Sequence, residues 1–238
     1  MLKKQQININ KLNNDFRITS LTRFLQKKFA IKTGKLIDVG AGNGIMLKFF
    51  KKKGFKVAGV EMVKDLYEIM KKDKELKEVK IMQGDITEKK GEGEFDYVLA
   101  CDVIEHIDND IGALNNLITY LKPDGNLILT VPAHSYLFGK RDIRLGHYRR
   151  YDKSELIDKI NRTNGRIDSI TYWNFIGFFV YFIYEKILRQ PVDDNFRYKK
   201  NIFSRFVSFF LSYSLRIEEL LGAAPIGLTL VVCIKRAK

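Results

Sequence analysis

Short apolar runs alternate with amphipathic stretches from residue 35 onward, and this alternation predicts strands and helices in turn. Strands are expected at residues 36–39, 57–60, 79–82, 97–100, 127–131, 167–172 and 228–234. Helices are expected between them, at residues 45–53, 64–74, 111–121 and 154–164. This order builds βαβ crossovers, so we expect an α/β fold with a mainly parallel sheet, helices on both faces and ligands at the carboxyl ends of the strands.

An N-terminal segment and an insertion stand outside this alternation. Residues 1–34 hold a polar, asparagine-rich arm and an amphipathic helix at 20–29, which we expect to cover the ligand cleft. Residues 35–238 form the main domain, in which an aromatic-rich insertion runs from about 173 to 222, between the sixth and seventh strands. A break at Gln190-Pro191 predicts two helices in this insertion.

The insertion has three interpretations. Its first apolar run, residues 175–184, is about half the roughly 20 residues that cross a bilayer, so no transmembrane helix is expected. A lid over an apolar or peptidic substrate, a dimer surface, and a membrane-surface patch flanked by Lys199, Lys200 and Arg205 all fit its aromatic residues. We favour the lid, on a chain that is a monomer or a homodimer.

The composition is that of a globular chain with an anionic partner. Of 238 residues, 45% are hydrophobic and 29% are charged, and Lys+Arg exceed Asp+Glu by 14. The resulting positive field favours an acidic peptide, a phosphate, a carboxylate, a nucleic acid or an anionic lipid. Cys101 and Cys233 lie in predicted strands without CxxC or Cys/His spacing, so we expect no disulfide, no metal site and a reducing, cytoplasmic location. The polar N-terminus shows no secretory signal.

A glycine-rich turn follows the first predicted strand. Gly40, Gly42 and Gly44 come after Asp38 and directly before a helix, which lets the backbone approach a ligand with no Cβ in between. The dinucleotide-binding fingerprint is GxGxxG, whereas this turn is GxGxG. The turn resembles motif I of the class I S-adenosylmethionine-dependent methyltransferases, in which Asp38 would organise the turn around the cofactor's amino group. Alternatively, Asp38 caps the turn.

The ends of the next strands match the same family in register. The resemblance implies that Glu61, 21 residues after Gly40, accepts both ribose hydroxyls, and that Met62 packs on the adenine or fills core. It also implies that Asp85 and Ile86 meet the adenine, and that Cys101 lines the methionine moiety. The match covers about residues 35–172, with 228–234 as a reversed final strand, and so implies a Rossmann-like seven-stranded mixed sheet.

The segment after the fifth strand is a candidate acceptor site. Residues 145–151, Leu-Gly-His-Tyr-Arg-Arg-Tyr, together with Asp142 resemble the signature of a subgroup of type 11 methyltransferases. Arginine forks bind carboxylates or phosphates, and aromatic rings supply walls. The candidate substrate-binding residues are Tyr136, Arg144, His147, Arg149, Arg150 and Trp173. Alternatively, His147 and Arg149 brace the loop through Asp142 and backbone carbonyls.

The chemistry depends on the accepting atom. Methyl transfer is an in-line displacement that relies on positioning, and it needs a base only where the nucleophile carries a proton. A hydroxyl would require His106, His134 or His147 as that base, whereas a carboxylate would need only cations to orient it. His106 could instead cap the helix that follows the fourth strand.

We therefore expect O-methylation of an anionic small molecule or peptide, with a peptide C-terminal carboxylate as one possibility. A lipid, quinone or polyketide-like acceptor is the alternative among enzymes, and peripheral membrane contact would accompany it. Nucleic acid is not expected, because no RNA-binding module and no Asn/Asp-Pro-Pro-Tyr motif is present. A catalytically silent S-adenosylmethionine-binding protein is the alternative of another class.

Overall fold

The computed structural model describes residues 15–88, 91, 93–190 and 202–237, with the side chains of 202–208 left aside. The polar arm at residues 1–14 lies outside the described residues. The same holds for the expected break at Pro191 and for the cations Lys199 and Lys200.

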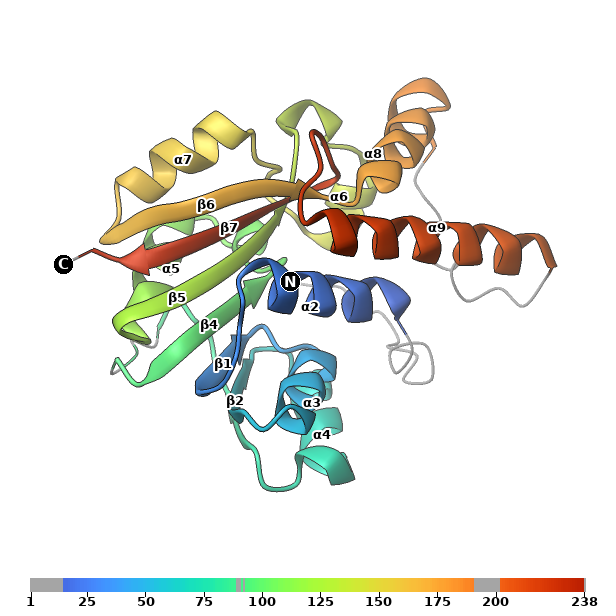
Figure 1. The fold of residues 1–238 in the computed structure, drawn as a ribbon. Helices are drawn as coiled ribbons and strands as arrows, with labels where there is room; N and C mark the ends of the chain where they lie inside the picture. Colours follow the sequence, from blue (N-terminus) through green and yellow to red (C-terminus); the bar gives the residue numbers. More distant parts are fainter. Residues whose placement is uncertain (1–14, 89–90, 92, 191–201, 238) are drawn as a thin grey trace.

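Seven strands form one sheet in the order β3-β2-β1-β4-β5-β7-β6 (Figure 1). They are β1 (Lys35–Val39), β2 (Lys56–Glu61), β3 (Lys80–Gln83), β4 (Phe95–Cys101), β5 (Leu121–Pro132), β6 (Gly165–Trp173) and β7 (Thr229–Arg236). The pairs among β1 to β5 are parallel, and β7 is antiparallel to both β5 and β6. The predicted mixed sheet with a reversed final strand is therefore confirmed.

Helices connect the strands and cover both faces of the sheet. They are α2 (Phe16–Lys28), α3 (Ile45–Lys52), α4 (Lys64–Lys72), α5 (Asp110–Thr119), α6 (Lys140–Leu145), α7 (Lys153–Asn161), α8 (Phe175–Phe182) and α9 (Ile202–Leu221). Four short helical turns are η1 (Lys74–Leu76), η2 (Ile104–His106), η3 (Ser135–Leu137) and the π-helical η4 (Ile183–Ile187). The hydrophobic pattern did not predict η2, η3 or α6, because each is too short to show a helical period.

The core consists of two apolar layers, one on each face of the sheet. Leu117 of α5 and Leu156 of α7 pack with Ile37 on one face. Phe24 of α2 and Leu215 of α9 pack on the other face, with Leu36 among their neighbours. Fully burying such a side chain contributes about 1.5–3 kcal/mol, so these layers hold the strand ends in place.

The two largest differences from the expected boundaries have local reasons. Helix α2 begins at Phe16 rather than near residue 20, because the Asp15 side chain accepts a hydrogen bond from the Arg17 backbone N–H and caps the helix. Strand β5 begins at Leu121 rather than at residue 127, because the chain pairs with Phe95 before the turn residues Pro123 to Gly125.

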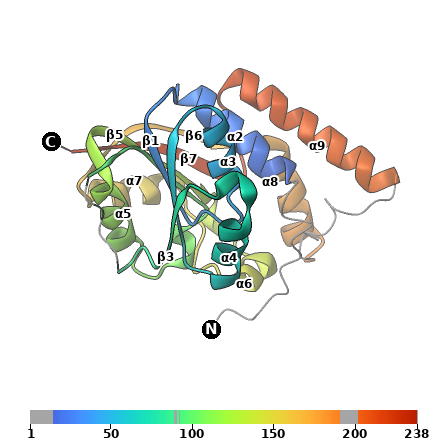
Figure 2. The same cartoon turned by 90° about the horizontal axis from the view of Figure 1, so that it is seen from below.

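The insertion forms the two expected helices, α8 and α9. Helix α9 lies beside α2 in both views (Figures 1 and 2). The buried Glu218 of α9 accepts hydrogen bonds from the backbone N–H groups of Asn174 and Phe175 and so caps the start of α8.

Exposed apolar residues of α9 are Phe209, Phe210, Tyr213, Ile217, Leu220 and Leu221. Among the described residues, every helix is too short or too polar to span a bilayer. The choice between lid, dimer surface and membrane patch stays a prediction.

Candidate active site

The glycine turn after β1 has left-handed backbone at all three glycines. Gly40, Gly42 and Gly44 have φ angles of 72°, 59° and 77°. A Cβ on Gly40 would lie 2.6 Å from Val103 Cγ2, and one on Gly44 would lie 2.6 Å from Leu76 Cδ1. A Cβ on Gly42 would meet no protein atom within 4 Å. Packing therefore requires two of the glycines, whereas the third borders open space that a ligand can use.

Two buried carboxylates lie beside this turn. Glu61 Oε2 accepts a hydrogen bond from the Gly42 N–H at 2.7 Å, and its Oε1 accepts one from Val63 N–H at 2.8 Å. Burial raises the pKa of Glu61 despite these bonds. Burial, and then the charge of Glu61, raise the pKa of Asp38 to about 8. The turn thus offers a protected place for a ligand that brings hydroxyl donors and a positive charge.

The raised pKa of Asp38 predicts a pH dependence of stability. An aspartate in the unfolded chain loses its proton near pH 4, whereas Asp38 in the folded chain keeps its proton up to about pH 8. The folded state binds more protons between these values, so this contribution to stability is lost as the pH rises from about 4 to 8. The melting temperature of wild type should therefore fall relative to that of Asp38→Asn as the pH is raised. Parallel curves would contradict the raised pKa, and Asp158→Asn on α7 is the exposed control.

The other predicted cofactor residues lie on neighbouring strand ends at the same edge of the sheet. Asp85 is half-buried and its Oδ1 accepts a hydrogen bond from the Thr87 N–H. Ile86 is buried, Met62 is exposed, and Cys101 is half-buried at the end of β4. A ligand that lies along this edge can contact all of them.

The sequence reasoning missed an ion pair between the N-terminal helix and this edge. Asp102, with a φ of 55°, follows β4, and its Oδ2 lies 2.5 Å from Nη2 of Arg17 in α2. Its Oδ1 accepts a hydrogen bond from the Thr130 hydroxyl. This contact ties α2 to the strand ends, consistent with the covering role expected for the helix.

Asp142 holds the loop after β5 together. Its buried carboxylate accepts hydrogen bonds from His147 Nδ1 at 2.9 Å, Arg150 Nε at 2.8 Å, Tyr181 Oη at 2.7 Å and Gly139 N at 3.0 Å. Burial would raise the pKa of Asp142, but the bonds from His147 and Arg150 lower it below its usual value. Arg150 is 2% exposed and also lies over the Tyr181 ring. Arg150 therefore stabilises the loop as a buried partner of Asp142.

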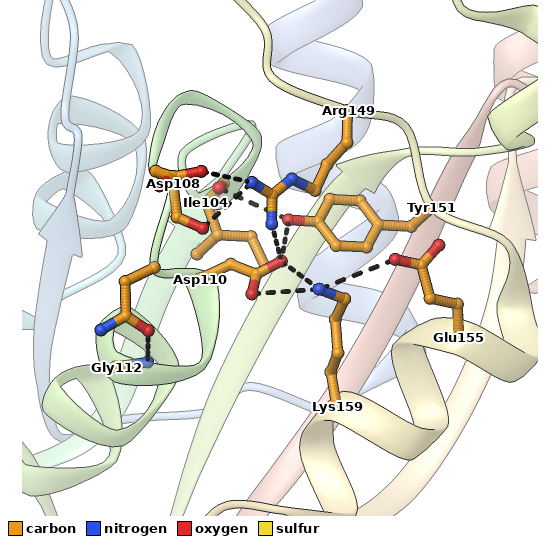
Figure 3. A network of polar contacts seen from close by, with 9 residues as sticks. Ile104, Asp108, Asp110, Gly112, Arg149, Tyr151, Glu155 and Lys159 are labelled. Carbon is orange, nitrogen blue, oxygen red and sulfur yellow. Dashed lines mark hydrogen bonds and ion pairs between the residues drawn. The ribbon is translucent and has the colours of Figure 1, made fainter.

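Arg149 anchors the same loop to α5 (Figure 3). Its Nη1 donates to Asp110 Oδ2 at 2.9 Å, and its Nη2 donates to the backbone oxygen of Asp108 at 3.0 Å. Asp110 also accepts from Tyr151 Oη and Lys159 Nζ, both at 2.9 Å. These contacts agree with the bracing alternative for His147 and Arg149. The assignment of Arg149 and Arg150 to the substrate stays a prediction.

His106 and His147 meet beside a buried carboxylate. Their ring centroids are 4.7 Å apart with the rings nearly perpendicular. Partial desolvation of the ring, and then the charge of His147, lower the pKa of His106 below its usual 6.5, although the side chain still reaches solvent, so the ring is mostly uncharged at neutral pH. Glu105 is fully buried, and neither of its carboxylate oxygens has a hydrogen-bond partner among the described residues. The sequence reasoning missed Glu105, although its place directly before His106 at a strand end was a signal.

His134 belongs to a separate aromatic group. Its ring stacks on Tyr172 at 5.3 Å, and the rings of Phe178 and Tyr136 lie 5.0 and 5.5 Å away. Burial lowers the pKa of His134, whose Nε2 lies 3.1 Å from the Gly227 oxygen. Tyr136 is 53% exposed, so this group has an accessible side.

The two remaining candidates differ in burial. Trp173 is fully buried in the core against Phe24, and its Nε1 has no hydrogen-bond partner among the described residues. Arg144 is exposed on α6. The assignment of both residues to substrate binding stays a prediction.

Known proteins resemble the chain in sequence and in fold. A family model described as a methyltransferase domain matches residues 13–179. The ubiquinone biosynthesis O-methyltransferase of Rickettsia typhi is 30% identical over 111 residues, which are 44% of this chain and 45% of that protein. The mitochondrial ubiquinone biosynthesis O-methyltransferase of Schizosaccharomyces pombe is 25% identical over 131 residues, or 53% and 48% of the two chains. The chain thus spans about half the length of the curated relatives it matches.

Solved structures share the fold at lower identity. A SAM-dependent methyltransferase from Archaeoglobus fulgidus has a TM-score of 0.60 at 15% identity, covering 95% of this chain and 96% of its own. The 1,6-didemethyltoxoflavin-N1-methyltransferase of Burkholderia thailandensis, with bound S-adenosylhomocysteine, has a TM-score of 0.59 at 16% identity and covers 97% and 82%.

Proposed function

The chain belongs to the methyltransferase-domain family that its residues 13–179 match, and we propose that it methylates a phenolic hydroxyl of an aromatic, quinone-precursor-like acceptor. The methyl donor is S-adenosylmethionine, the cofactor of its structural neighbours. The residues of the glycine turn fit this cofactor: Gly42 leaves open space, and Asp38 and Glu61 supply the buried carboxylates.

The observation that carries the proposal is the pairing of the loop arginines inside the chain. Arg149 is bound to Asp108 and Asp110, and Arg150 is bound to Asp142. Turning Arg150 toward a substrate carboxylate would break a fully buried ion pair, which costs about 3–5 kcal/mol. Turning Arg149 would leave the buried Asp110 without this partner, at a smaller cost because Arg149 is partly exposed. Both arginines are therefore engaged within the chain, and the abundance of cations in this loop is weak support for an anionic acceptor.

The surroundings suit a flat, weakly polar acceptor instead. The rings of His134, Tyr136, Tyr172 and Phe178 lie at the carboxyl ends of β5 and β6 and can border an aromatic ring. The names of the curated relatives, ubiquinone biosynthesis O-methyltransferases, add support for a hydroxyl on a quinone-type ring.

His106 supplies the proton chemistry that a hydroxyl needs. Bound S-adenosylmethionine supplies a methyl group on a sulfonium, which is an activated electrophile. His106 is uncharged at neutral pH and lies exposed at the end of β4, so it can accept the hydroxyl proton as the oxygen attacks the methyl carbon. Asp142 fixes the ring of His147 beside it and so positions the pair.

An acceptor panel tests the proposal. Purified protein with radiolabelled S-adenosylmethionine should methylate catechol-type phenols and leave peptide C-termini and small carboxylates unlabelled. Tyr136→Ala should raise the KM for the phenol about tenfold, since it removes an exposed wall of the aromatic group, while the affinity for the cofactor stays unchanged. Tyr213→Ala, an equally exposed tyrosine on α9, is the matched control. Labelling of carboxylates alone would overturn the phenol assignment and restore the anionic acceptor.

A further inference from the structure

We propose that Glu105, His106 and His147 bind one divalent transition-metal ion, such as zinc, at the carboxyl end of β4. One candidate ligand atom from each of the three side chains lies within 4.8 Å of the other two. Two of the residues come from the end of β4 and the third from the loop that follows α6. No metal-ligand spacing is visible in the chain here, because about forty residues separate His147 from the adjacent pair Glu105 and His106.

The strongest observation is the state of Glu105. The side chain is fully buried, and both of its oxygens lack a hydrogen-bond partner among the described residues. Leaving a buried acceptor unpaired costs about 1–3 kcal/mol, and more if the group is charged. A bound cation would remove this cost, since it would neutralise the carboxylate and occupy its lone pairs.

The two histidines carry the outer contacts that metal ligands usually have. Asp142 is an ionised acceptor, so His147 Nδ1 carries the hydrogen of their 2.9 Å contact and Nε2 keeps its lone pair. His106 is hydrogen-bonded to the backbone of Gly146. A ligand histidine typically gives its second N–H to a carboxylate or a carbonyl, which fixes the tautomer and the ring direction. Each ring therefore has one nitrogen whose lone pair can bind the ion.

The donor set selects the class of metal. Two imidazoles and one carboxylate suit zinc, iron(II) and neighbouring ions, whereas magnesium and calcium prefer oxygen ligands. With bonds of about 2.0–2.2 Å, two ligands of one ion lie no more than about 4.4 Å apart, so the three side chains need only a small closure. His106 is exposed on the short turn η2 and can make this movement.

A three-ligand site leaves coordination positions open. Because His106 reaches solvent, an acceptor oxygen can occupy such a position. In metal-loaded protein the free lone pair of His106 would be bound to the ion, so the cation rather than His106 would promote loss of the hydroxyl proton, which would pass to solvent. The backbone supports this geometry: the Tyr148 N–H donates to the backbone carbonyl oxygen of Glu105 at 2.8 Å and joins the loop to η2. This role in methyl transfer rests on the proposed function, whereas binding of the ion does not.

The test uses chelator-treated full-length protein and cobalt(II) or zinc alone. Calorimetry should give one ion per chain, and the visible spectrum of cobalt should indicate nitrogen and oxygen ligands. His106→Ala and His147→Ala should each weaken binding at least tenfold, whereas His134→Ala, the third histidine of the chain, should leave it unchanged. Equal affinity in all four proteins, or no binding at all, would overturn the proposal.

Folding and activity are measured separately from metal binding, so that loss of one can be distinguished from loss of another. His106 is exposed, so His106→Ala keeps the fold and remains informative if Glu105→Gln or His147→Ala loses it. Cofactor affinity should be the same with and without zinc. Metal binding without methylation of any phenol would contradict the proposed acceptor and leave the metal site standing. Methylation of phenols by protein that binds no metal would contradict the metal site and leave the proposed acceptor standing.

Discussion

An Asp142→Ala protein is expected to lose about 3–5 kcal/mol of folding free energy relative to wild type. The substitution removes the acceptor of four hydrogen bonds and leaves the buried Arg150 guanidinium without its carboxylate. The carboxylate is ionised at all working pH values, since its pKa lies below the usual range, so the loss should persist from pH 5 to 8. Urea denaturation followed by tryptophan fluorescence and by circular dichroism measures it.

The control for this prediction is Asp158→Ala on α7. Asp158 is an exposed aspartate, so its removal should change the stability by no more than about 0.5 kcal/mol. Asp142→Asn should fall between wild type and Asp142→Ala, because an amide oxygen still accepts but carries no charge. A midpoint for Asp142→Ala within error of the control would show that the network contributes nothing to stability.

A Gly42→Ala protein is expected to fold but to bind S-adenosylmethionine at least about tenfold more weakly, a loss of about 1.4 kcal/mol or more. A Cβ there meets no protein atom within 4 Å and extends into the space assigned to the cofactor. Alanine at a φ of 59° also carries backbone strain of about 1–2 kcal/mol, which lowers the stability of the fold. Calorimetry gives the affinity, and thermal melts without cofactor give the stability.

Gly54 provides the matched control for Gly42. It has a φ of 85°, a Cβ there would also meet nothing within 4 Å, and it lies just before β2, at the opposite edge of the sheet. Gly54→Ala should therefore suffer the same kind of strain and keep its cofactor affinity. Equal affinities in the two variants would remove Gly42 from the cofactor site.

The cofactor half of the site could be predicted from the sequence because each of its residues follows directly from a strand end. Asp38, Glu61 and Asp85 end or follow neighbouring parallel strands, so the order of strands alone brings them to one edge. The glycine spacing then added the conformation that the turn requires, and the structure has it.

The acceptor half could not be predicted in the same way, because its residues depend on partners far away in the chain. The cations of the loop suggested an anionic ligand, yet Arg149 is paired with aspartates 39 and 41 positions earlier. Trp173, a candidate substrate residue, lies in the core against Phe24, so its place depends on the packing of α2. Glu105 stands out because its buried carboxylate oxygens lack hydrogen-bond partners among the described residues, and a sequence pattern cannot predict this.

The two carboxylates Asp110 and Asp142 also determine how the loop from Gly139 to Tyr151 moves. Through them the loop is joined to α5 and α8, so opening it would break the ion pair of Arg149 with Asp110 and the hydrogen bond of Tyr181 with Asp142. Its amide hydrogens should therefore exchange with solvent at rates close to those of the core rather than those of a surface loop. The loop is in this sense part of the cooperative folding unit, and if it borders the acceptor as proposed, substrate exchange must proceed through motion of other segments.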